Sequence, residues 1–329
     1  MRKITRHVAV VTVAALALAG CGAQQDGSVP GAPSETETVV HTGPGGGSDV
    51  FAREVIKLMQ QDKLISDSWP VRNQTDGASI GAMKYLAGKQ GRDDTIAAIT
   101  PTWLVTPLTV EGGSVSIDDL QPIAALLIEP QMMAVRADSP YHTPQDFINA
   151  AKAKPATLTQ VGGSTTATDS LTGKELQAQT GAKWKFQSFS GGAARTDALV
   201  KGDAQMMIGG ASDFNDLVKS GKLRIISVIG ADRVSSFPDV PALQEQGFDV
   251  SSLPQEFRGF VGPKGMSDDA LKYYQDVLGK LVQSNAWLDY AKQNGDITQF
   301  LGADEFQALL TLQKNNLLTL AGQLDLVKK

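Results

Sequence analysis

The strongest chemical signal in the sequence is the segment from Gly43 to Asp49, which reads Gly-Pro-Gly-Gly-Gly-Ser-Asp and precedes a helical pattern. Glycines allow positive φ and let several backbone N–H groups point the same way. At the start of a helix such groups favour an anion by ~0.3–1 kcal/mol. The loop predicts an anion site or, alternatively, a plain turn with Ser48 or Asp49 as the helix N-cap.

Two nucleotide motifs resemble this loop only in part. Gly43 and Gly45 would begin a dinucleotide fingerprint, but Ser48 stands at the position of its third Gly or Ala. A phosphate-binding P-loop requires a lysine after its last glycine, and Gly47 is followed by serine and aspartate. The loop therefore does not predict a nucleotide cofactor.

Two further small-residue loops occur in the middle of the chain. Gly162-Gly163-Ser164-Thr165-Thr166 follows an apolar run and precedes a helical segment that contains Asp169. Ser190-Gly191-Gly192 has the same relation to the next helical segment. Backbone donors of these loops are of the same chemical kind as those of the first loop, so two lobes with facing loops would give one anion site between them.

Histidine and cysteine offer little for catalysis. Outside the first twenty residues only His41 and His142 occur, and no G-x-S-x-G elbow or metal-ligand spacing accompanies them. Both are expected at the surface or behind the site. We expect no catalytic residue, no metal and no cofactor, so the chain is not expected to be an enzyme; a small-molecule hydrolase is the weakest alternative.

Three arginines and two tryptophans can each be interpreted as ligand-binding or as structural residues. Arg53, Arg195 and Arg258 are candidates for charge-assisted bonds to a carboxylate. Arg53 is equally explained as an i, i+4 partner of Asp49. The two tryptophans Trp103 and Trp184 would line a cleft or pack in a core.

The elements that must position these loops alternate in the manner of an α/β fold. Strands are expected at 38–41, 96–100, 123–127, 132–136, 158–161, 185–189, 205–208 and 224–229. Helices are expected from about 51 to 61, at 144–153 with Thr143 as N-cap, at 170–179 and 193–201, from about 212, and at 268–284 and 306–320. The same order of strand, small-residue loop and helix recurs in both halves.

The N-terminus has the features of an exported protein. A positive start with Arg2, Lys3 and Arg6 precedes a short apolar run, and Leu18-Ala19-Gly20-Cys21 follows it. Small residues before a cysteine resemble the lipobox of bacterial lipoproteins, in which Cys21 would take the lipid, such as palmitate. Residues 22–38 are polar and small and predict a flexible tether.

Composition excludes several classes. The 329 residues carry 30 Lys and Arg against 35 Asp and Glu, which argues against nucleic acid as a partner. Removal of residues 1–20 would leave 27 against 35, a net charge of −8. The single cysteine excludes an intramolecular disulfide.

Several motifs together carry a family resemblance. They are Cys21, Pro44–Asp49 with Arg53, Gly77 and Gly81, Val161–Ser164 through Thr168-Asp169, Ser190-Gly191-Gly192, Phe237–Pro241 with Gly247, and Arg258–Met266. In this order and spacing, from about Val39 to the C-terminus, the chain resembles the Bug, or TctC-type, extracytoplasmic receptors of tripartite tricarboxylate transporters. It departs from the family at Ser170, where a histidine is common, and at Phe257, where a tryptophan is common; both departures bear on the ligand.

The resemblance implies a two-lobe, periplasmic-binding-protein-like (Venus flytrap) α/β fold, each lobe a mostly parallel sheet flanked by helices. Residues 1–20 would be a lipoprotein signal peptide, 21–38 a lipidated tether, 39–135 with 254–329 the first lobe, and 136–253 the second. Carried over by position, the ligand-binding residues are Gly45, Gly46, Gly47, Ser48, Asp49, Gly163, Ser164, Thr165, Thr166, Asp169, Ser190, Gly191 and Gly192.

The function implied is that of a monomeric solute-binding protein, lipid-anchored outside the cell membrane, that delivers a small carboxylate to integral-membrane permease subunits. Two loops on opposite lobes would each take a carboxylate group, so a dicarboxylate or a citrate-like tricarboxylate is expected. A sensor that feeds a two-component kinase would have the same sequence features and stays as the alternative.

Overall fold

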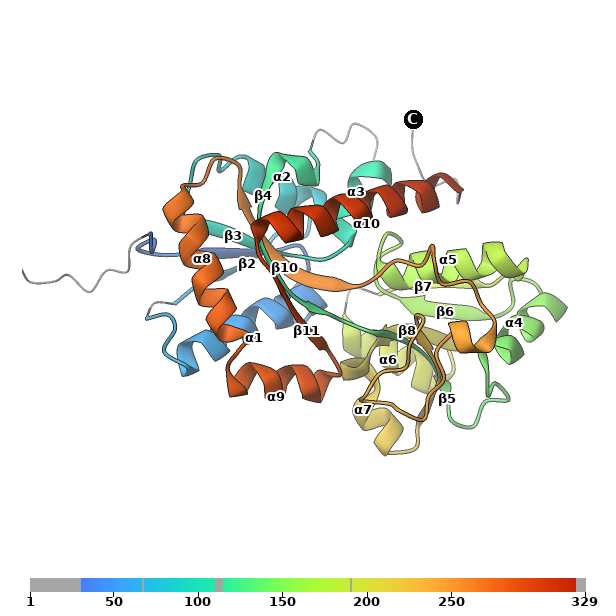
Figure 1. The fold of residues 1–329 in the computed structure, drawn as a ribbon. Helices are drawn as coiled ribbons and strands as arrows, with labels where there is room; N and C mark the ends of the chain where they lie inside the picture. Colours follow the sequence, from blue (N-terminus) through green and yellow to red (C-terminus); the bar gives the residue numbers. More distant parts are fainter. Residues whose placement is uncertain (1–30, 67, 110–114, 190, 324–329) are drawn as a thin grey trace, which may run out of the picture.

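The structure is a computed structural model, and it describes residues 31–66, 68–109, 115–189 and 191–323. The expected signal peptide, the Cys21 lipidation site and the first part of the tether lie outside the described residues, as does Ser190. The described chain folds into two lobes that lie side by side, each built on one β-sheet with helices on both faces (Figure 1). The predicted two-lobe α/β architecture is confirmed.

The first lobe holds a six-stranded sheet in the order β11-β4-β10-β3-β1-β2. Its strands are β1 (Glu37–Val40), β2 (Val71–Asn73), β3 (Thr95–Ile99), β4 (Leu120–Ile128), β10 (Phe257–Pro263) and β11 (Ile297–Leu301). Its helices are α1 (Gly47–Gln61), α2 (Ile80–Ala87), α3 (Thr102–Thr109), α8 (Asp268–Leu281), α9 (Asn285–Asn294) and α10 (Ala303–Gln323), with a 3₁₀ turn at Ile117–Asp119.

The second lobe holds a five-stranded sheet in the order β7-β6-β8-β5-β9. Its strands are β5 (Gln131–Arg136), β6 (Thr159–Gly162), β7 (Lys185–Ser188), β8 (Met206–Gly210) and β9 (Leu223–Ile229). Its helices are α4 (Pro144–Ala153), α5 (Thr168–Thr180), α6 (Gly192–Lys201) and α7 (Ala211–Lys219), with a 3₁₀ turn at Gln244–Gln246. The Thr143 cap of α4 is confirmed, since its hydroxyl accepts the Asp146 N–H at 3.2 Å.

Both sheets are mixed, which corrects the expectation of mostly parallel sheets. The first sheet has two parallel and three antiparallel pairings, and the second has two of each. The parallel pairs arise from strand–helix–strand units. The antiparallel pairs involve the strands that carry the chain between lobes: β4 leads out of the first lobe and β10 leads back into it, so the two run in opposite directions.

The chain crosses between the sheets twice, and the two crossings are joined. It passes from β4 to β5 through Glu129 and Pro130, and the Glu129 N–H donates to the carbonyl of Glu256 on the returning segment at 3.0 Å. Strand β5 pairs with β8 and β9, although residues up to 135 were expected in the first lobe. Periodicity marks β5 as a strand but carries no information about which sheet it joins.

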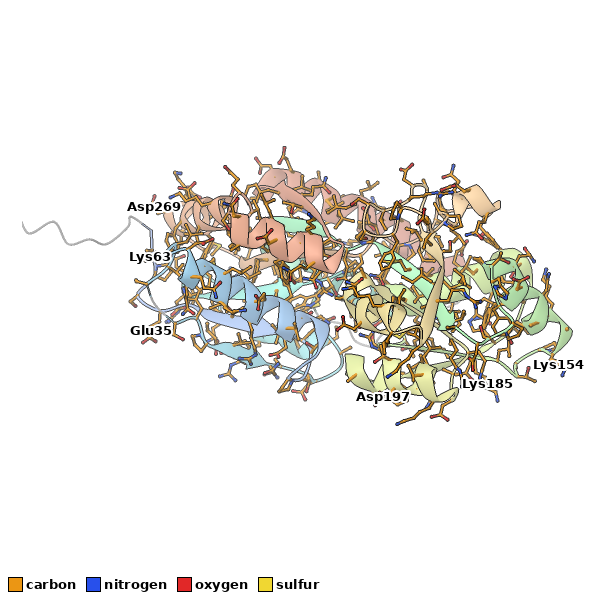
Figure 2. All side chains as sticks on the ribbon, turned by 90° about the horizontal axis from the view of Figure 1, so that it is seen from below. Glu35, Lys63, Lys154, Lys185, Asp197 and Asp269 are labelled. Atoms are coloured by element: carbon orange, nitrogen blue, oxygen red, sulfur yellow. The ribbon has the colours of Figure 1, made fainter. Side chains whose placement is uncertain are left out.

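Each sheet is buried on both faces, which explains its continuous apolar strands. In the first sheet the side chains alternate: Val40 packs with α1, α8 and α9, and Val39 packs with α2, α3 and α10. In the second sheet Met132 faces α6 and α7, and Met133 faces α4 and α5. Figure 2 shows the molecule as an elongated body, with Lys63 and Asp269 near one end and Lys154 at the other.

Candidate functional site

Among the cavities between the lobes, two neighbouring ones of about 140 Å³ and about 170 Å³ lie where the small-residue loops meet. We call the two together the interlobe cleft. Six residues line both of them: Gly47, Glu129, Arg195, Ser212, Asp213 and Arg258. Because these residues come from both lobes and from the crossing between them, the cleft exists only in the folded chain.

The first-lobe loop reaches the cleft through its glycines. Gly45 and Gly47 line the cleft, whereas Gly46, Ser48 and Asp49 do not. Gly45 has a φ of 77°, a conformation that favours glycine. A Cβ on Gly47 would come within 3.3 Å of Arg258 Nη2, so the missing side chain lets the guanidinium pack over the start of α1.

Asp49 braces this loop from behind. Its carboxylate accepts the Gly45 N–H at 2.9 Å, Asn73 Nδ2 at 2.9 Å and Arg53 Nε at 2.9 Å. Burial raises the pKa of Asp49, but these hydrogen bonds outweigh burial and hold the pKa below its usual value. Arg53 is the i, i+4 partner and its side chain is half exposed, so it does not point into the cleft.

His41 lies behind the loop in a closed environment. Trp103 Nε1 donates to His41 Nδ1 at 2.9 Å, and the Ser48 hydroxyl lies 3.4 Å from the same nitrogen. Burial and the charge of Arg258 lower the pKa of His41 to about 4, so the imidazole is neutral at pH 7. Trp103 and Trp184 are buried core residues, so they pack in the interior and do not line the cleft.

The second-lobe loop contains a similar brace. The carboxylate of Asp169 accepts the Gly163 N–H at 2.7 Å and the Ser170 N–H at 2.7 Å. Gly163 and Asp169 line the cleft, but Ser164, Thr165 and Thr166 do not.

Thr166 joins the lobes instead. Its hydroxyl lies 3.2 Å from the Thr106 hydroxyl of α3 and 3.1 Å from the Ser164 hydroxyl. Thr165 is exposed at the tip of the loop. These three residues stay predictions as ligand contacts, and the described structure places them at the lobe boundary or at the surface.

Two more helices begin at the cleft. Gly192 is the first residue of α6 and lines the cleft, with Gly191 as its N-cap. Helix α7 follows Gly209 and Gly210 in the same manner, and its Ser212 also lines the cleft. Helix α7 was expected from about residue 212, but its place at the cleft was not. The Gly209-Gly210 start repeats the small-residue pattern of the other loops and could have pointed to it.

The helices that begin at the cleft have N-cap residues that supply no capping side chain, a property that α2 with its N-cap Ser79 shares. The N-caps of α1, α5, α6 and α7 are Gly46, Ala167, Gly191 and Gly210, and none makes a side-chain cap bond. By contrast, α4, α8 and α9 are capped by Thr143, Ser267 and Ser284 side chains. Side chains still occupy the third N–H of two of these helices, since the Asp49 N–H donates to Thr42 Oγ1 at 3.1 Å and the Ser170 N–H donates to Asp169 Oδ1 at 2.7 Å. In α1 and α5 the N–H groups of the first two residues are therefore the ones that face a ligand anion.

Two arginines and five carboxyl groups line the cleft: Arg195 and Arg258, with Glu129, Asp169, Asp213, Glu256 and Asp296. Arg258 Nε donates to Glu129 Oε2 at 2.6 Å. Arg195 lies 3.9 Å from Asp169 Oδ2 and 3.6 Å from Asp213 Oδ1. The sequence analysis singled out both arginines and Asp169, and it missed the other four carboxyl groups.

Burial is the main cause of unusual pKa values in the cleft. It raises the pKa of Glu256 to about 7, with Glu129 and Asp169 adding to the shift and Arg258 opposing it. It also raises the pKa of Asp296 to about 7, with Glu129 adding to the shift. The pKa of Asp169 and that of Asp213 are raised for the same first reason.

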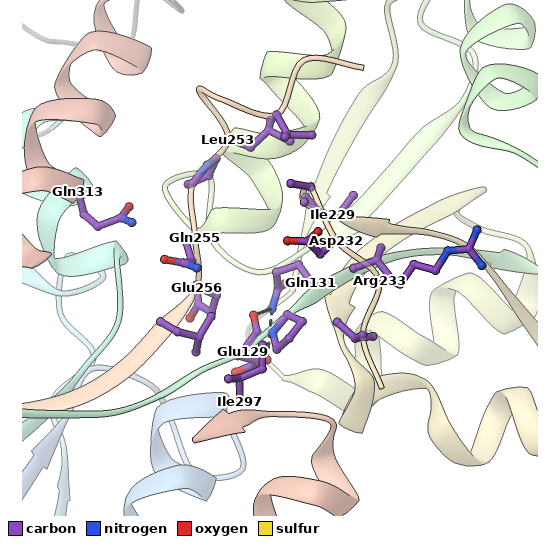
Figure 3. A pocket seen from close by; sticks show the side chains of 18 residues that line it. Glu129, Gln131, Ile229, Asp232, Arg233, Leu253, Gln255, Glu256, Ile297 and Gln313 are labelled. Carbon is purple, nitrogen blue, oxygen red and sulfur yellow. Dashed lines mark hydrogen bonds between the residues drawn. The ribbon is translucent and has the colours of Figure 1, made fainter. Parts of the chain in front are cut away.

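A third cavity, of about 380 Å³, lies at the chain crossing (Figure 3). It shares Glu129, Gln131 and Glu256 with the cleft. Gln131 Nε2 lies 3.4 Å from Glu129 Oε1. These three residues thus separate the interlobe cleft from the third cavity.

The described residues contain neither a metal-binding cluster nor a membrane-spanning helix. In that part of the chain no group of three or more His, Cys, Asp or Glu is arranged to hold a metal ion. No helix in the described ranges is both long enough and apolar enough to cross a membrane.

Comparison with known proteins gives a family match over most of the chain. The family described as "Tripartite tricarboxylate transporter family receptor" matches residues 58–315. The solved structure of the periplasmic binding protein BugD is similar at 19% identity, with a TM-score of 0.81, and the match covers 91% of this chain and 100% of BugD.

Two similar solved structures hold a carboxylate ligand. Rpa4515 of R. palustris, solved with adipate, has a TM-score of 0.81 at 17% identity, with 88% of this chain and 97% of that chain covered. MatC of Rhodopseudomonas palustris, solved with bound malate, has a TM-score of 0.74 at 16% identity, with 89% and 99% covered.

Proposed function

This chain belongs to the tripartite tricarboxylate transporter receptor family, and on that premise we propose that its interlobe cleft captures a small carboxylate for uptake. The observation that carries the proposal is the set of helix starts whose own N-cap residues supply no capping side chain. Helix α1 of the first lobe and α5, α6 and α7 of the second begin at the cleft, and their N-caps are glycine or alanine. Backbone N–H groups and aligned helix dipoles at these points attract carboxylate oxygens.

A ligand with two carboxylate groups fits this arrangement because the helix starts belong to two lobes. One group would be held by α1 and the other by the helices of the second lobe. Such a ligand contacts both lobes only when they are close, so its binding energy favours the closed arrangement. Adipate and malate, bound by two structural neighbours, are both dicarboxylates, which supports dicarboxylates as first candidates and citrate-like tricarboxylates as second.

We assign this chain an extracytoplasmic location, a lipid anchor on Cys21 and delivery of the ligand to integral-membrane permease subunits. The family description supports a receptor that works with a transporter. Glu35, within the expected tether, lies at the end of the first lobe away from the second (Figure 2). A tether that leaves from this end would keep the cleft clear of the anchor.

Calorimetric titration of the purified full chain with succinate, malate, adipate and citrate tests the carboxylate assignment. We expect at least one of them to bind, whereas glucose does not. If none of a broad panel of carboxylates binds while the chain is folded, the assignment is wrong.

A backbone substitution tests the role of the helix starts. Proline is tolerated at the first position of a helix but lacks the N–H group. Gly192→Pro removes one donor at the start of α6 and should weaken carboxylate binding several-fold. The matched control is Asp268→Pro, at the first position of α8 outside the cleft, which should leave binding unchanged. Equal effects of the two substitutions would contradict the proposal.

A further inference from the structure

One tyrosine in the wall of the cleft belongs to none of the glycine loops. Tyr290 of helix α9 lines the cavity of about 170 Å³, which Gly47 at the start of α1 also lines. The Tyr290 ring packs against the first-lobe core, and its centre lies 5.5 Å from that of the Trp287 ring. The core thus holds the ring in place, and the hydroxyl is the polar end of a fixed side chain.

The Tyr290 hydroxyl lies on the cavity side of α9. Burial raises its pKa above the usual value of a phenol, and the charge of Arg258 opposes this shift. The charges of Asp296 and Glu129 add to it. All three charged groups line the same cavity as Tyr290, so the phenol oxygen is the part of the side chain that faces them. Because its pKa is raised, the hydroxyl keeps its proton at pH 7 and can donate a hydrogen bond.

This donor has no partner within the part of the chain that the structure describes. The backbone carbonyl of Tyr290 accepts Asn294 Nδ2 at 3.0 Å, but no described residue is bonded to the hydroxyl. By contrast, the buried hydroxyl of Tyr274 lies 3.1 Å from Thr36 Oγ1 and donates to the carbonyl of Asp93 at 2.7 Å. A polar group that is shielded from water without a partner costs free energy, so the Tyr290 hydroxyl lacks an acceptor.

The second lobe encloses this side of the cavity. Helix α9 lies next to α7 (Figure 1). Asn215 Nδ2 of α7 donates to the carbonyl of Gln293 at 2.9 Å. A Cβ on Gly295, the C-cap of α9, would lie 2.7 Å from the Cβ of Ala211, so the turn that ends α9 packs directly on the start of α7. In this closed arrangement an acceptor for the Tyr290 hydroxyl must come from inside the cavity.

We propose that Tyr290 is a ligand-binding residue whose hydroxyl donates a hydrogen bond to the ligand carboxylate held at the start of α1. The inference rests on the proposed function and adds to its site a side chain from outside the glycine loops. A carboxylate is the acceptor that fits, because the Gly47 backbone and the Arg258 guanidinium reach the same cavity and lie next to each other. The phenol is an uncharged donor, so it holds an anion while Arg258 keeps its ion pair with Glu129.

The variant Tyr290→Phe tests this contact, because phenylalanine keeps the ring and removes only the hydroxyl. The probe is whichever of succinate, malate, adipate and citrate binds the full chain most tightly in calorimetric titration at pH 7.5. We expect Tyr290→Phe to weaken its binding at least about tenfold. The unfolding temperature of the ligand-free chain should stay unchanged, since the hydroxyl makes no hydrogen bond to a described residue.

Tyr141→Phe is the matched control. Tyr141 packs against the core of the second lobe, is partly buried and lines neither cavity of the cleft. Its hydroxyl also has no partner among the residues that the structure describes. This variant should bind the probe as tightly as the parent chain, and equal losses in Tyr141→Phe and Tyr290→Phe would overturn the inference.

The outcomes separate the inference from the proposed function. If Tyr290→Phe binds the probe as tightly as the parent chain, the inference is wrong and the carboxylate function stands. It is also wrong if the variant weakens binding of malate and citrate but not of succinate and adipate, because the phenol would then bind a ligand hydroxyl. If the parent chain binds none of a broad panel of carboxylates, the proposed function fails together with the inference.

A crystal structure of the full chain with the same probe gives an independent measurement. The Tyr290 oxygen should lie about 2.5–3.0 Å from a carboxylate oxygen of the probe. A separation above about 3.5 Å, with or without a water between the two oxygens, would overturn the direct contact.

Discussion

The glycine loops of the two lobes have the same local design and different electrostatic surroundings. In the first lobe Asp49 accepts the N–H of Gly45, and in the second Asp169 accepts the N–H of Gly163. Each aspartate lies in the first turn of the helix that follows its loop. Both loops are thus held in shape by a carboxylate in the next helix.

The difference lies in what else surrounds the two carboxylates. Asp49 points away from the cleft and is paired with Arg53 and Asn73, which keep its pKa low. Asp169 lines the cleft, its cation Arg195 is 3.9 Å away, and burial raises its pKa. The carboxylate of the first loop is thus paired within the protein, whereas that of the second lies in the cleft with a raised pKa. The same local design therefore places one carboxylate behind the cleft and the other in it.

The largest expected difference is in stability. Asp49→Ala leaves the Gly45 N–H and the Asn73 amide without their acceptor, and it should lower the free energy of unfolding by about 3 kcal/mol. Asp169→Ala also removes two hydrogen bonds but relieves a buried charge, so a loss of about 1 kcal/mol is expected. Urea unfolding at pH 7 measures both values. Equal losses would show that the two braces are equivalent.

The second largest effect on stability is expected where a glycine of the second-lobe loop has no room for a side chain. A Cβ on Gly162 would lie 2.3 Å from Asp169 Oδ2 and 2.7 Å from the Phe186 ring. Gly162→Ala should therefore cost about 2 kcal/mol of unfolding free energy. At Gly163 the nearest atom would be 3.6 Å away, so Gly163→Ala is a matched control with an expected cost below about 0.5 kcal/mol. A larger loss at Gly163 would mean that the loop is packed differently.

Backbone conformation gives a smaller effect in the first loop. Gly45 has open space around it but a φ of 77°, so Gly45→Ala should cost about 1 kcal/mol through strain alone. Gly43 also has open space, and its φ lies outside the region that favours glycine. Thermal unfolding of Gly43→Ala, which should match the parent chain, provides the reference. Equal unfolding temperatures of Gly45→Ala and Gly43→Ala would contradict the expected backbone strain at position 45.

The smallest expected effect is the change with pH in the stability costs of Asp49→Ala and Asp169→Ala, which should have opposite signs. The pKa of Asp49 is lowered in the folded state, so its contribution to stability is present above its unfolded pKa and is lost as pH falls through the lower folded value. The cost of Asp49→Ala should shrink by less than about 1 kcal/mol between pH 7 and pH 4. The pKa of Asp169 is raised, so its ionisation opposes folding as pH rises, and the cost of Asp169→Ala should instead grow on acidification. Urea unfolding at both pH values gives the signs, and two changes of the same sign would contradict the comparison.

Much of the fold was predictable because its signals are local. Apolar runs marked most strands, and 3.6-residue periods marked most helices, because burial of one face follows from spacing alone. Six helices and strands were not predicted: β2, α2, α3, α9, β10 and β11. Strand β10 lies within a motif that the sequence analysis noted for its family resemblance, and its place between β3 and β4 depends on a pairing with segments far away in the chain.

The candidate site was predictable only in part. The loops that present backbone donors could be identified because runs of glycine and other small residues between a strand and a helix are visible in the sequence. Ser48, Asp49 and Arg53 belong to the expected loop region but lie behind the cleft, since local sequence does not tell which side of a loop faces inward. The position of Ser190 lies outside the described residues.

By itself the sequence determined the strand, loop and helix units, the glycine positions and the family. The tertiary structure alone decided the electrostatic character of the cleft. Glu129 and Glu256 come from the two chain crossings, and Asp296 comes from a turn after α9, so nothing near them in the sequence predicts that they share a site. Charge acts through space over several ångströms, whereas periodicity and capping act along the chain. The backbone donors could therefore be predicted from the sequence, and the acidic groups that share their cleft could not.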